Sequence, residues 1–236
     1  MNVQEASEHR PSSELTGPIL SRLRQAVALY LWERGAVRVN AEEPFRLASG
    51  NYSPIYVNCR TVISDPSFMR LFATAAAMLL ERQGASFDAV AGGETAGIPY
   101  ACQLAPALGL PVLYIRKKPK GYGIASQVEG HLAPGSRVLL VEDLITDGGS
   151  KVGFLDGVKA AGGLVTDALV LFDRQQGGAK LLAEQGVTLH AVTDRATAFS
   201  VGGASGLVDE MLRRSVDDYF HDPAAWHRNR GLDYSA

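Results

Sequence analysis

Two adjacent acids, Glu142 and Asp143, end an apolar run and stand just before a turn of small polar residues. The apolar run is Val138 to Val141, and the turn is TDGGS (146–150). Small residues let backbone N–H groups converge, and a helix that starts there adds partial positive charge, so this turn is suited to a phosphate. The acids would repel a phosphate, but they suit hydroxyl groups or a hydrated magnesium ion. Ribose 5-phosphate, with a phosphate at one end and a diol at the other, satisfies both.

The elements that must position these residues follow from the pattern around them. From Asp88 onward, short apolar runs alternate with helical segments that end at glycine. Near-continuous apolar strands are typical of a parallel sheet covered on both faces. The sequence therefore predicts an α/β fold with a mostly parallel sheet flanked by helices. The expected strands are 88–93, 111–117, 137–143, 166–173 and 187–194, and the expected helices between them are 96–109, 149–163 and 177–186.

The first 87 residues follow a different pattern. Residues 15–37 predict an amphipathic helix, and residues 65–84 predict a second helix that begins at Asp-Pro-Ser. Between them, SGNYSP separates Phe45–Leu47 from Ile55–Val57, which predicts a hairpin. Ligands of open α/β sheets bind at the carboxyl ends of the strands, so we expect this part to cover the ligand as a small hood. The apolar side of the first helix should hold Leu23, Val27, Tyr30 and Leu31, with Trp32 in the core.

The domain prediction has four parts. Residues 1–14 are expected to be a disordered tail, 15–87 the N-terminal helix and hood subdomain, 88–204 the α/β core and 205–236 a C-terminal helical extension. In the extension, His221 and His227 have no cysteine at a metal-ligand spacing, and we expect both at the surface.

Composition excludes several classes of protein. The net charge of −2 and the pI of about 6.2 do not indicate nucleic-acid binding. No apolar run reaches the roughly 18–20 residues of a membrane span, and the N-terminus lacks the apolar region of a secretory signal. Cys59 and Cys102 do not form a disulfide framework, so we expect two buried free thiols in a reducing compartment. A soluble cytoplasmic protein is the expectation.

The stretch VLLVEDLITDGGS (138–150) resembles the phosphoribosyl diphosphate (PRPP) motif of the type I phosphoribosyltransferases. The resemblance implies that the two acids hold the ribose hydroxyls and that the following loop holds the 5-phosphate. On this reading the PRPP-binding residues here are Glu142, Asp143, Thr146, Asp147, Gly148, Gly149 and Ser150.

Four further stretches resemble one branch of that family, the orotate phosphoribosyltransferases. FRLASGNYSPIYVNCR (45–60) is similar to the hood motif, and IRKKPKGYG (115–123) to the basic mobile loop. GGETAGIP (92–99) occupies the place of the pyrophosphate loop, and LFDRQQGG (171–178) is similar to the strand end whose arginine, here Arg174, contacts orotate. The resemblance extends from about Leu15 to about Ala198. It implies Mg²⁺-dependent synthesis of orotidine 5-monophosphate from PRPP and orotate, with pyrophosphate released, in UMP biosynthesis.

The leaving pyrophosphate carries several negative charges, so catalysis needs cations where that charge develops. The basic loop supplies four cations within five positions, and a loop that closes would exclude water. The resemblance implies catalytic roles for Lys120, Arg116, Lys117 and Asp143, the three cations also binding PRPP. It also implies a homodimer in which loop 117–128 reaches the neighbouring active site.

The remaining expectations concern pyrophosphate, the base and the metal. Glu94 and Thr95 are expected on the PRPP side, and their peptide bond is the candidate for a non-proline cis bond. The guanidinium fork of one arginine suits the edge of a planar anion. Mg²⁺ is expected to be held mainly by PRPP, with no direct protein ligand. The residues expected to contact orotate are Arg174, Thr146, Tyr56 and Ser49.

Departures from the family pattern leave alternatives open. Ala48 and Ala96 stand where some relatives carry lysine, and Arg46 is a candidate for the missing hood charge. The loop reads Gly-Tyr-Gly (121–123) where relatives often have Asp-His-Gly or Asp-Tyr-Gly, so the aspartate and the histidine are missing. The alternatives are a phosphoribosyltransferase for another base and a PRPP-sensing regulator that binds nucleic acid, against which the net charge counts. A fused decarboxylase barrel of roughly 250 residues is not expected at this length.

Overall fold

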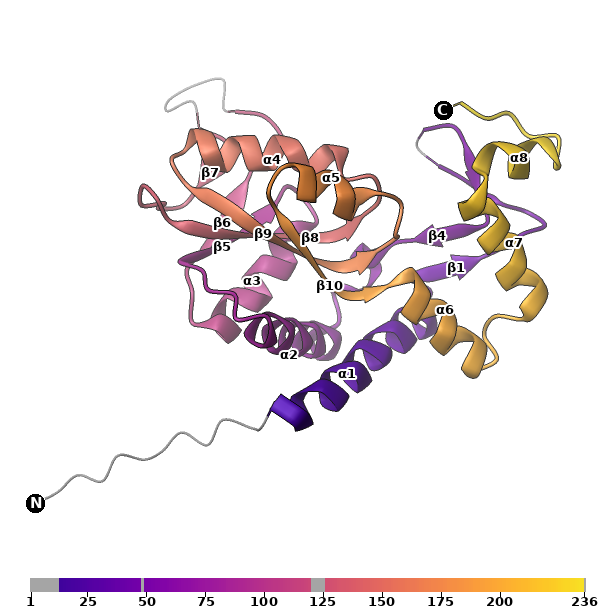
Figure 1. Cartoon of the computed structure of the whole chain (residues 1–236), viewed down its shortest axis with the longest axis horizontal. Helices are drawn as coiled ribbons and strands as arrows, with labels where there is room; N and C mark the ends of the chain where they lie inside the picture. The colour runs from indigo at the N-terminus through magenta and orange to yellow at the C-terminus, as the bar shows by residue number, and fades with distance from the viewer. Residues whose placement is uncertain (1–12, 48, 120–125, 236) are drawn as a thin grey trace, which may run out of the picture.

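The computed structural model describes residues 13–47, 49–119 and 126–235, and Lys120 and Ala48 lie outside these ranges. At its centre is a six-stranded sheet with the order β10–β9–β8–β5–β6–β7 (Figure 1). All neighbours are parallel except β6 and β7. The predicted mostly parallel sheet is therefore confirmed. Its strands are β5 (Ala89–Gly93), β6 (Val112–Ile115), β7 (Val128–Glu129), β8 (Arg137–Ile145), β9 (Leu164–Asp173) and β10 (Thr188–Asp194).

Helices cover both faces of this sheet (Figure 1). Each face has its own cluster of buried apolar side chains, which explains why the central strands are apolar without alternation. Val138 to Val141 of β8, for example, are all nearly inaccessible to solvent. One face carries α1 (Ser13–Glu33), α2 (Pro66–Arg82) and α3 (Gly97–Leu108), with α6 (Arg195–Ala204) packed on α1. The other face carries α4 (Gly149–Ala160) and α5 (Gly178–Glu184).

The predicted helices and strands all form, with shifts of a few residues at their ends. Helix α1 begins at Ser13, within the stretch expected to be a tail. The predicted buried side of α1 is confirmed, and the Trp32 indole donates a hydrogen bond to the Ala198 carbonyl at 2.8 Å. The short strand β7 and helix α6 were not predicted from the pattern. No helix in the described ranges is long and apolar enough to cross a bilayer.

The hood is built from two small antiparallel pairs, and its register differs from our prediction. β1 (Val37–Val39) pairs with β4 (Ile55–Val57), and β2 (Phe45–Arg46) pairs with β3 (Tyr52–Ser53). The expected hairpin between Phe45–Leu47 and Ile55–Val57 is therefore wrong. Part of SGNYSP is itself a strand, because the tight turn at Gly50 (φ 92°) lets Tyr52 return beside Arg46. A short 3-10 helix, η1 (Cys59–Val62), leads from β4 back to the core.

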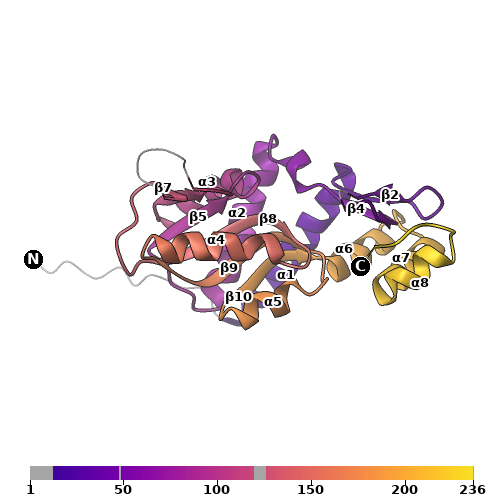
Figure 2. The same cartoon turned by 90° about the horizontal axis from the view of Figure 1, so that it is seen from above.

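The C-terminal extension packs against the hood (Figure 2). It forms α7 (Glu210–His221) and α8 (Pro223–Arg228), joined by a T-shaped contact between Tyr219 and Trp226 with ring centroids 5.2 Å apart. The prediction that His227 lies at the surface is wrong: its exposed fraction is 0%. Its Nε2 accepts a hydrogen bond from the Tyr52 backbone N–H at 3.0 Å, and its Nδ1 lies 2.6 Å from the Pro223 carbonyl. The other predicted surface histidine, His221, is exposed.

The two cysteines have different environments. Cys59 is a buried free thiol, as expected, and burial raises its pKa. Cys102 is exposed, so the prediction that both thiols are buried is wrong for this one. It lies on the outer side of α3, where helical periodicity turns one position away from the core.

Candidate active site

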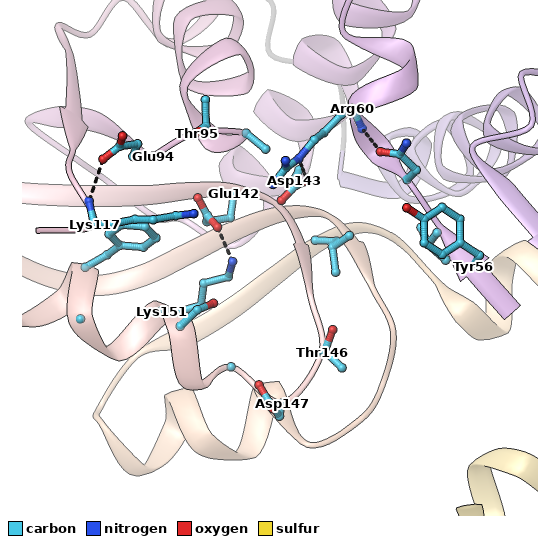
Figure 3. Close-up of a pocket in the computed structure, with 18 residues that line it drawn as sticks. Tyr56, Arg60, Glu94, Thr95, Lys117, Glu142, Asp143, Thr146, Asp147 and Lys151 are labelled. Atoms are coloured by element: carbon cyan, nitrogen blue, oxygen red, sulfur yellow. Dashed lines mark hydrogen bonds and ion pairs between the residues drawn. The ribbon is translucent and has the colours of Figure 1, made fainter. Parts of the chain in front are cut away.

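A cavity of about 750 Å³ lies at the carboxyl ends of β5 and β8 (Figure 3). Its walls come from the hood, from the turns after β5 and β6, and from the turn between β8 and α4. These segments are far apart in sequence, and they meet because the parallel strands end at one edge of the sheet. The predicted site residues that line it are Tyr56, Glu94, Thr95, Lys117, Glu142, Asp143, Thr146, Asp147, Gly148 and Ser150.

The adjacent acids point to opposite faces of β8, as consecutive residues of a strand do. Glu142 faces α4 and forms a salt bridge with Lys151. Its side chain is only 8% exposed, and Oε1 has no hydrogen-bond partner among the described residues. Burial raises the pKa of Glu142 to about 7, although Lys151 acts to lower it. Glu142 is therefore a carboxylate whose ionisation depends on its cationic partner.

Asp143 faces the hood side. Arg60 of η1 reaches across the cavity, with its Nε 3.7 Å from Asp143 Oδ2 (Figure 3). The Arg60 side chain is 63% exposed, so this pair is accessible to a ligand and weak by itself. The Tyr100 hydroxyl donates a hydrogen bond to the Cys59 carbonyl at 2.6 Å, which anchors η1 to α3. Alternation along β8 thus separates the two negative charges and gives each a cation on its own side.

The turn after β8 is shaped to receive an anion. Gly148 has φ 86° and stands at the N-cap of α4, with no side chain capping the helix. A Cβ there would lie 3.2 Å from Gly178 Cα, so both conformation and space favour glycine. Asp147 Oδ1 accepts a hydrogen bond from the Gly149 N–H at 3.0 Å and shapes the turn. Gly148 offers no capping side chain, so apart from the Gly149 N–H, which is bonded to Asp147, the positive end of the α4 dipole opens into the cavity.

The turns after β5 and β6 are joined by Glu94. Its Oε2 accepts a hydrogen bond from the Lys117 N–H at 2.9 Å, and its own N–H donates to the Ile115 carbonyl at 2.8 Å. The Glu94–Thr95 peptide bond is cis, which confirms the prediction. These contacts fix the start of the basic segment at the cavity wall, so Lys117 is the predicted loop cation that the described structure brings to the site.

Other predicted residues do not line the cavity. The Arg116 side chain pairs with Glu129 at 3.6 Å instead. Ser49 and Arg46 are exposed on the hood, so Arg46 does not supply the missing charge in this arrangement. Gly149 begins α4 just behind the lining residues. Lys120, the fourth predicted catalytic residue, lies outside the described ranges.

Arg174 is close to the site but largely buried. Its Nε and Nη2 have no hydrogen-bond partner among the described residues, and burial lowers its pKa. Its backbone N–H donates to the Ile145 carbonyl at 3.0 Å, which places it next to the end of β8. An unpaired buried guanidinium is unfavourable, so this position is suited to an anion.

Three polar lining residues were missed by the sequence reasoning: Asn58, Arg60 and Lys151. Asn58 Oδ1 accepts from the Arg60 N–H at 3.2 Å and so begins η1. Arg60 ends the stretch that resembles the hood motif, and Lys151 directly follows the TDGGS turn. Their positions beside two recognised motifs could have identified them as site residues. The sequence spacing could not show that Arg60 and Lys151 pair with the two acids of β8.

The donor set is suited to a cation held mainly by a ligand. In the described ranges no three His, Cys, Asp or Glu side chains converge in a way that could hold a metal ion. Carboxylates still line the cavity, and Asp143 and Asp147 can accept hydrogen bonds from the hydration shell of a hard cation. The cavity as a whole offers acceptors, the N-terminus of a helix and cations, which suits a phosphorylated sugar.

Comparison with known proteins agrees with this geometry. The sequence model of the family "Phosphoribosyl transferase domain" matches residues 61–194. An orotate phosphoribosyltransferase of Rhizobium etli (strain CIAT 652) is 41% identical over 222 residues, which cover 93% of this chain and 97% of that one. A crystal structure of orotate phosphoribosyltransferase from Aeropyrum pernix is similar with a TM-score of 0.64 and 34% identity, over 75% of this chain and 99% of that chain. The structure of Leishmania donovani UMP synthase is similar with a TM-score of 0.73 and 27% identity, over 84% of this chain and 42% of that chain.

Proposed function

Because this chain belongs to the orotate phosphoribosyltransferases, within the phosphoribosyl transferase family, we propose that it joins orotate to the phosphoribosyl group of PRPP. The products are orotidine 5-monophosphate and pyrophosphate, in the synthesis of UMP. One observation carries the proposal: a single cavity gathers two acids, the N-terminus of α4 and Lys117. Ribose hydroxyls, a 5-phosphate and a diphosphate leaving group need these groups.

The phosphoribosyl end binds at the turn between β8 and α4. Backbone N–H groups at the start of α4, with the helix dipole behind them, hold the 5-phosphate. Thr146 and Ser150 line the same wall and can donate hydroxyl hydrogen bonds to it. Asp143 and Glu142 accept hydrogen bonds from the ribose hydroxyls, and this fixes the sugar with its anomeric carbon towards the hood.

In the reaction the bond from the anomeric carbon to pyrophosphate breaks, and a bond to orotate N1 forms with loss of the N1 proton. Charge builds on the leaving pyrophosphate, and Lys117 is placed to stabilise it. We propose the same task for Lys120 and, after release from Glu129, for Arg116. Asp143 and Asp147 would contact the water shell of a Mg²⁺ ion that arrives with PRPP, and this ion would supply further screening of the same charge.

Orotate is proposed to lie between the hood and the end of β9. Tyr56 lines the cavity from the hood, and Arg174 supplies guanidinium nitrogens that lack a partner among the described groups. The orotate carboxylate would satisfy those nitrogens, which explains how a buried arginine is useful at this position. Thr146 and Ser49 stay predictions for orotate contact, since Ser49 lies on the exposed hood turn.

The test is an absorbance assay with purified protein, orotate, PRPP and Mg²⁺, in which orotate loss is followed. Turnover should require all three components and should fall strongly in Asp143→Asn and Lys120→Ala. Uracil and adenine serve as competing bases. Turnover of uracil or adenine in place of orotate would overturn the choice of base. PRPP binding without turnover of any base would favour the alternative of a PRPP-sensing regulator.

The homodimer and the crossing loop are also proposals. Two inactive variants, Lys120→Ala and Asp143→Asn, can be mixed and allowed to exchange subunits. If the loop acts in the neighbouring site, mixed dimers contain one intact site, and about a quarter of wild-type activity returns. If activity stays absent although mixed dimers form, the loop acts within its own subunit. The cytoplasmic location stays a prediction, which cell fractionation would test.

A further inference from the structure

Lys151 is one of three polar residues of the cavity to which the family resemblance assigned no role. It is the third residue of α4, and its side chain is 9% exposed, while that of its partner Glu142 is 8% exposed. Figure 3 shows the two side chains pointing towards one another below the opening of the cavity. A lysine beside a phosphate-binding turn would ordinarily extend to the anion, yet this one is bonded to a carboxylate.

The surroundings hold the Glu142 carboxylate tightly. A Cβ on Gly93 would lie 2.2 Å from Glu142 Oε1, and a Cβ on Gly97 would lie 2.6 Å from it, so β5 and α3 pack directly against this oxygen. The neighbour across the sheet is Val170 of β9. These three positions carry no charge, and Lys151 is therefore the cation in direct contact with Glu142.

Two other charged groups act on Glu142 from farther away. Asp143 raises its pKa by repulsion, and Arg60 of η1 lowers it. Burial is the largest effect and raises the pKa, whereas Lys151 is the strongest influence in the opposite direction. With Lys151 in place the pKa of Glu142 is about 7, and without Lys151 this buried acid next to Asp143 would stay protonated to a higher pH, because burial penalises the charged form. A PRPP polyanion bound nearby would increase that tendency further.

We propose that Lys151 is a positioning residue for the ribose end of PRPP, acting through Glu142. It favours the ionised form of that carboxylate and fixes it against Gly93 and Gly97, so that both adjacent acids can accept hydrogen bonds from the sugar. The inference rests on the proposed function and deepens it. Lys151 contacts neither the base nor the leaving group in this scheme, so its effect is confined to the affinity for PRPP and its pH dependence.

The first experiment compares Lys151→Met, Lys151→Arg and the control Lys159→Met, an exposed lysine on the same helix. Lys151→Met should raise KM and Kd for PRPP about 10- to 100-fold at pH 7, the range for losing a hydrogen bond to a charged group. The value of kcat and the KM for orotate should change little. Lys151→Arg should recover part of the affinity, and Lys159→Met should match the wild type.

The pH profile separates positioning from a purely structural role. In Lys151→Met the Glu142 pKa rises, so PRPP affinity should be weak at pH 7 and should recover as the pH is raised towards 9. In the wild type the same increase in PRPP affinity should occur at a lower pH. A variant that is less stable but has wild-type PRPP affinity at every pH would overturn the proposal.

A double-mutant comparison covers the case in which Lys151→Met does not fold. Glu142→Gln and Glu142→Gln/Lys151→Met both remove the buried anion, so the second leaves no charge uncompensated. If Lys151 acts through Glu142, the two should bind PRPP equally. A large further loss in the double variant would show direct phosphate contact and refute the proposal. Calorimetric PRPP binding is the readout, so failure of orotate turnover in the wild type would count only against the proposed function.

Discussion

Replacing Gly93 by alanine tests whether the packing around Glu142 is as tight as the structure indicates. The new Cβ would lie 2.2 Å from Glu142 Oε1 and 2.6 Å from Phe154 Cε2. Ordinary contacts begin near 3.4 Å, so the carboxylate must move by about 1.2 Å. It cannot do so freely, because Lys151 holds the other oxygen and Gly97 of α3 closes the far side.

The expected cost follows from these contacts. Overpacking a core costs about 1–3 kcal/mol, and disturbing a buried ion pair adds to it, up to about 3–5 kcal/mol if the pair is broken. Removing a glycine from the unfolded chain returns about 0.4–1 kcal/mol. We therefore expect Gly93→Ala to lower the free energy of unfolding by at least about 2 kcal/mol. For a domain of this size that corresponds to a fall in Tm of about 4–8 °C.

The assay is urea unfolding and a thermal melt, with Gly203→Ala as the matched control. Gly203 lies in α6, and a Cβ there meets nothing within 4 Å. Alanine should be neutral at that position or stabilise the helix by up to about 1 kcal/mol. PRPP affinity should fall in Gly93→Ala and stay unchanged in the control. A Gly93→Ala protein as stable as the wild type would refute the reasoning, since it would mean that Glu142 moves without cost.

Four other changes test separate parts of the structure. Tyr100→Phe removes the hydroxyl that donates to the Cys59 carbonyl and should cost about 0.5–1.5 kcal/mol in urea unfolding; an unchanged midpoint would contradict the bond between η1 and α3. His227→Gln should raise KM for orotate about 3- to 10-fold by loosening the hood at Tyr52, with PRPP affinity unchanged; equal losses for both substrates would argue against this role. The pKa of Glu142 is raised from 4.5 to about 7, so between these pH values the folded chain binds a proton that the unfolded chain has released. The free energy of unfolding should therefore fall as the pH rises from about 4.5 to about 7. Glu142→Gln should remove that decline. In native protein a thiol reagent should modify exposed Cys102 quickly and buried Cys59 only on unfolding, as a timed labelling experiment would show.

Features that depend on neighbouring residues could be predicted from the sequence. The apolar run into Glu142 and Asp143 identifies a buried strand, because burial on both faces requires consecutive apolar side chains. The small polar turn and the helix after it identify an anion site, because the backbone at a helix start is the same in any protein. The alternation of strands and helices predicts the parallel sheet, since each crossover needs a helix.

The register of paired strands, the rotation of helices and the burial of side chains could not be predicted from neighbouring residues. The hood hairpin was predicted with the wrong partner because Tyr52–Ser53 is a strand of only two residues within a turn-rich stretch. His227 was expected in solvent because no cysteine lies at a metal-ligand spacing from it, whereas its burial depends on a hood residue that is 175 positions away. Local sequence carries no information about which distant surface an element will meet.

The sequence by itself determined the chemistry that the protein presents: two acids after a strand, a phosphate turn, a basic segment and the resemblance that they carry. Only the tertiary structure decided how that chemistry is arranged. It placed Glu142 against Lys151 and Asp143 against Arg60, on opposite faces of one strand. The physical reason is that the sequence specifies which residue types are present and in what order. The partner, the exposure and the pKa of a side chain depend on elements that only folding brings together.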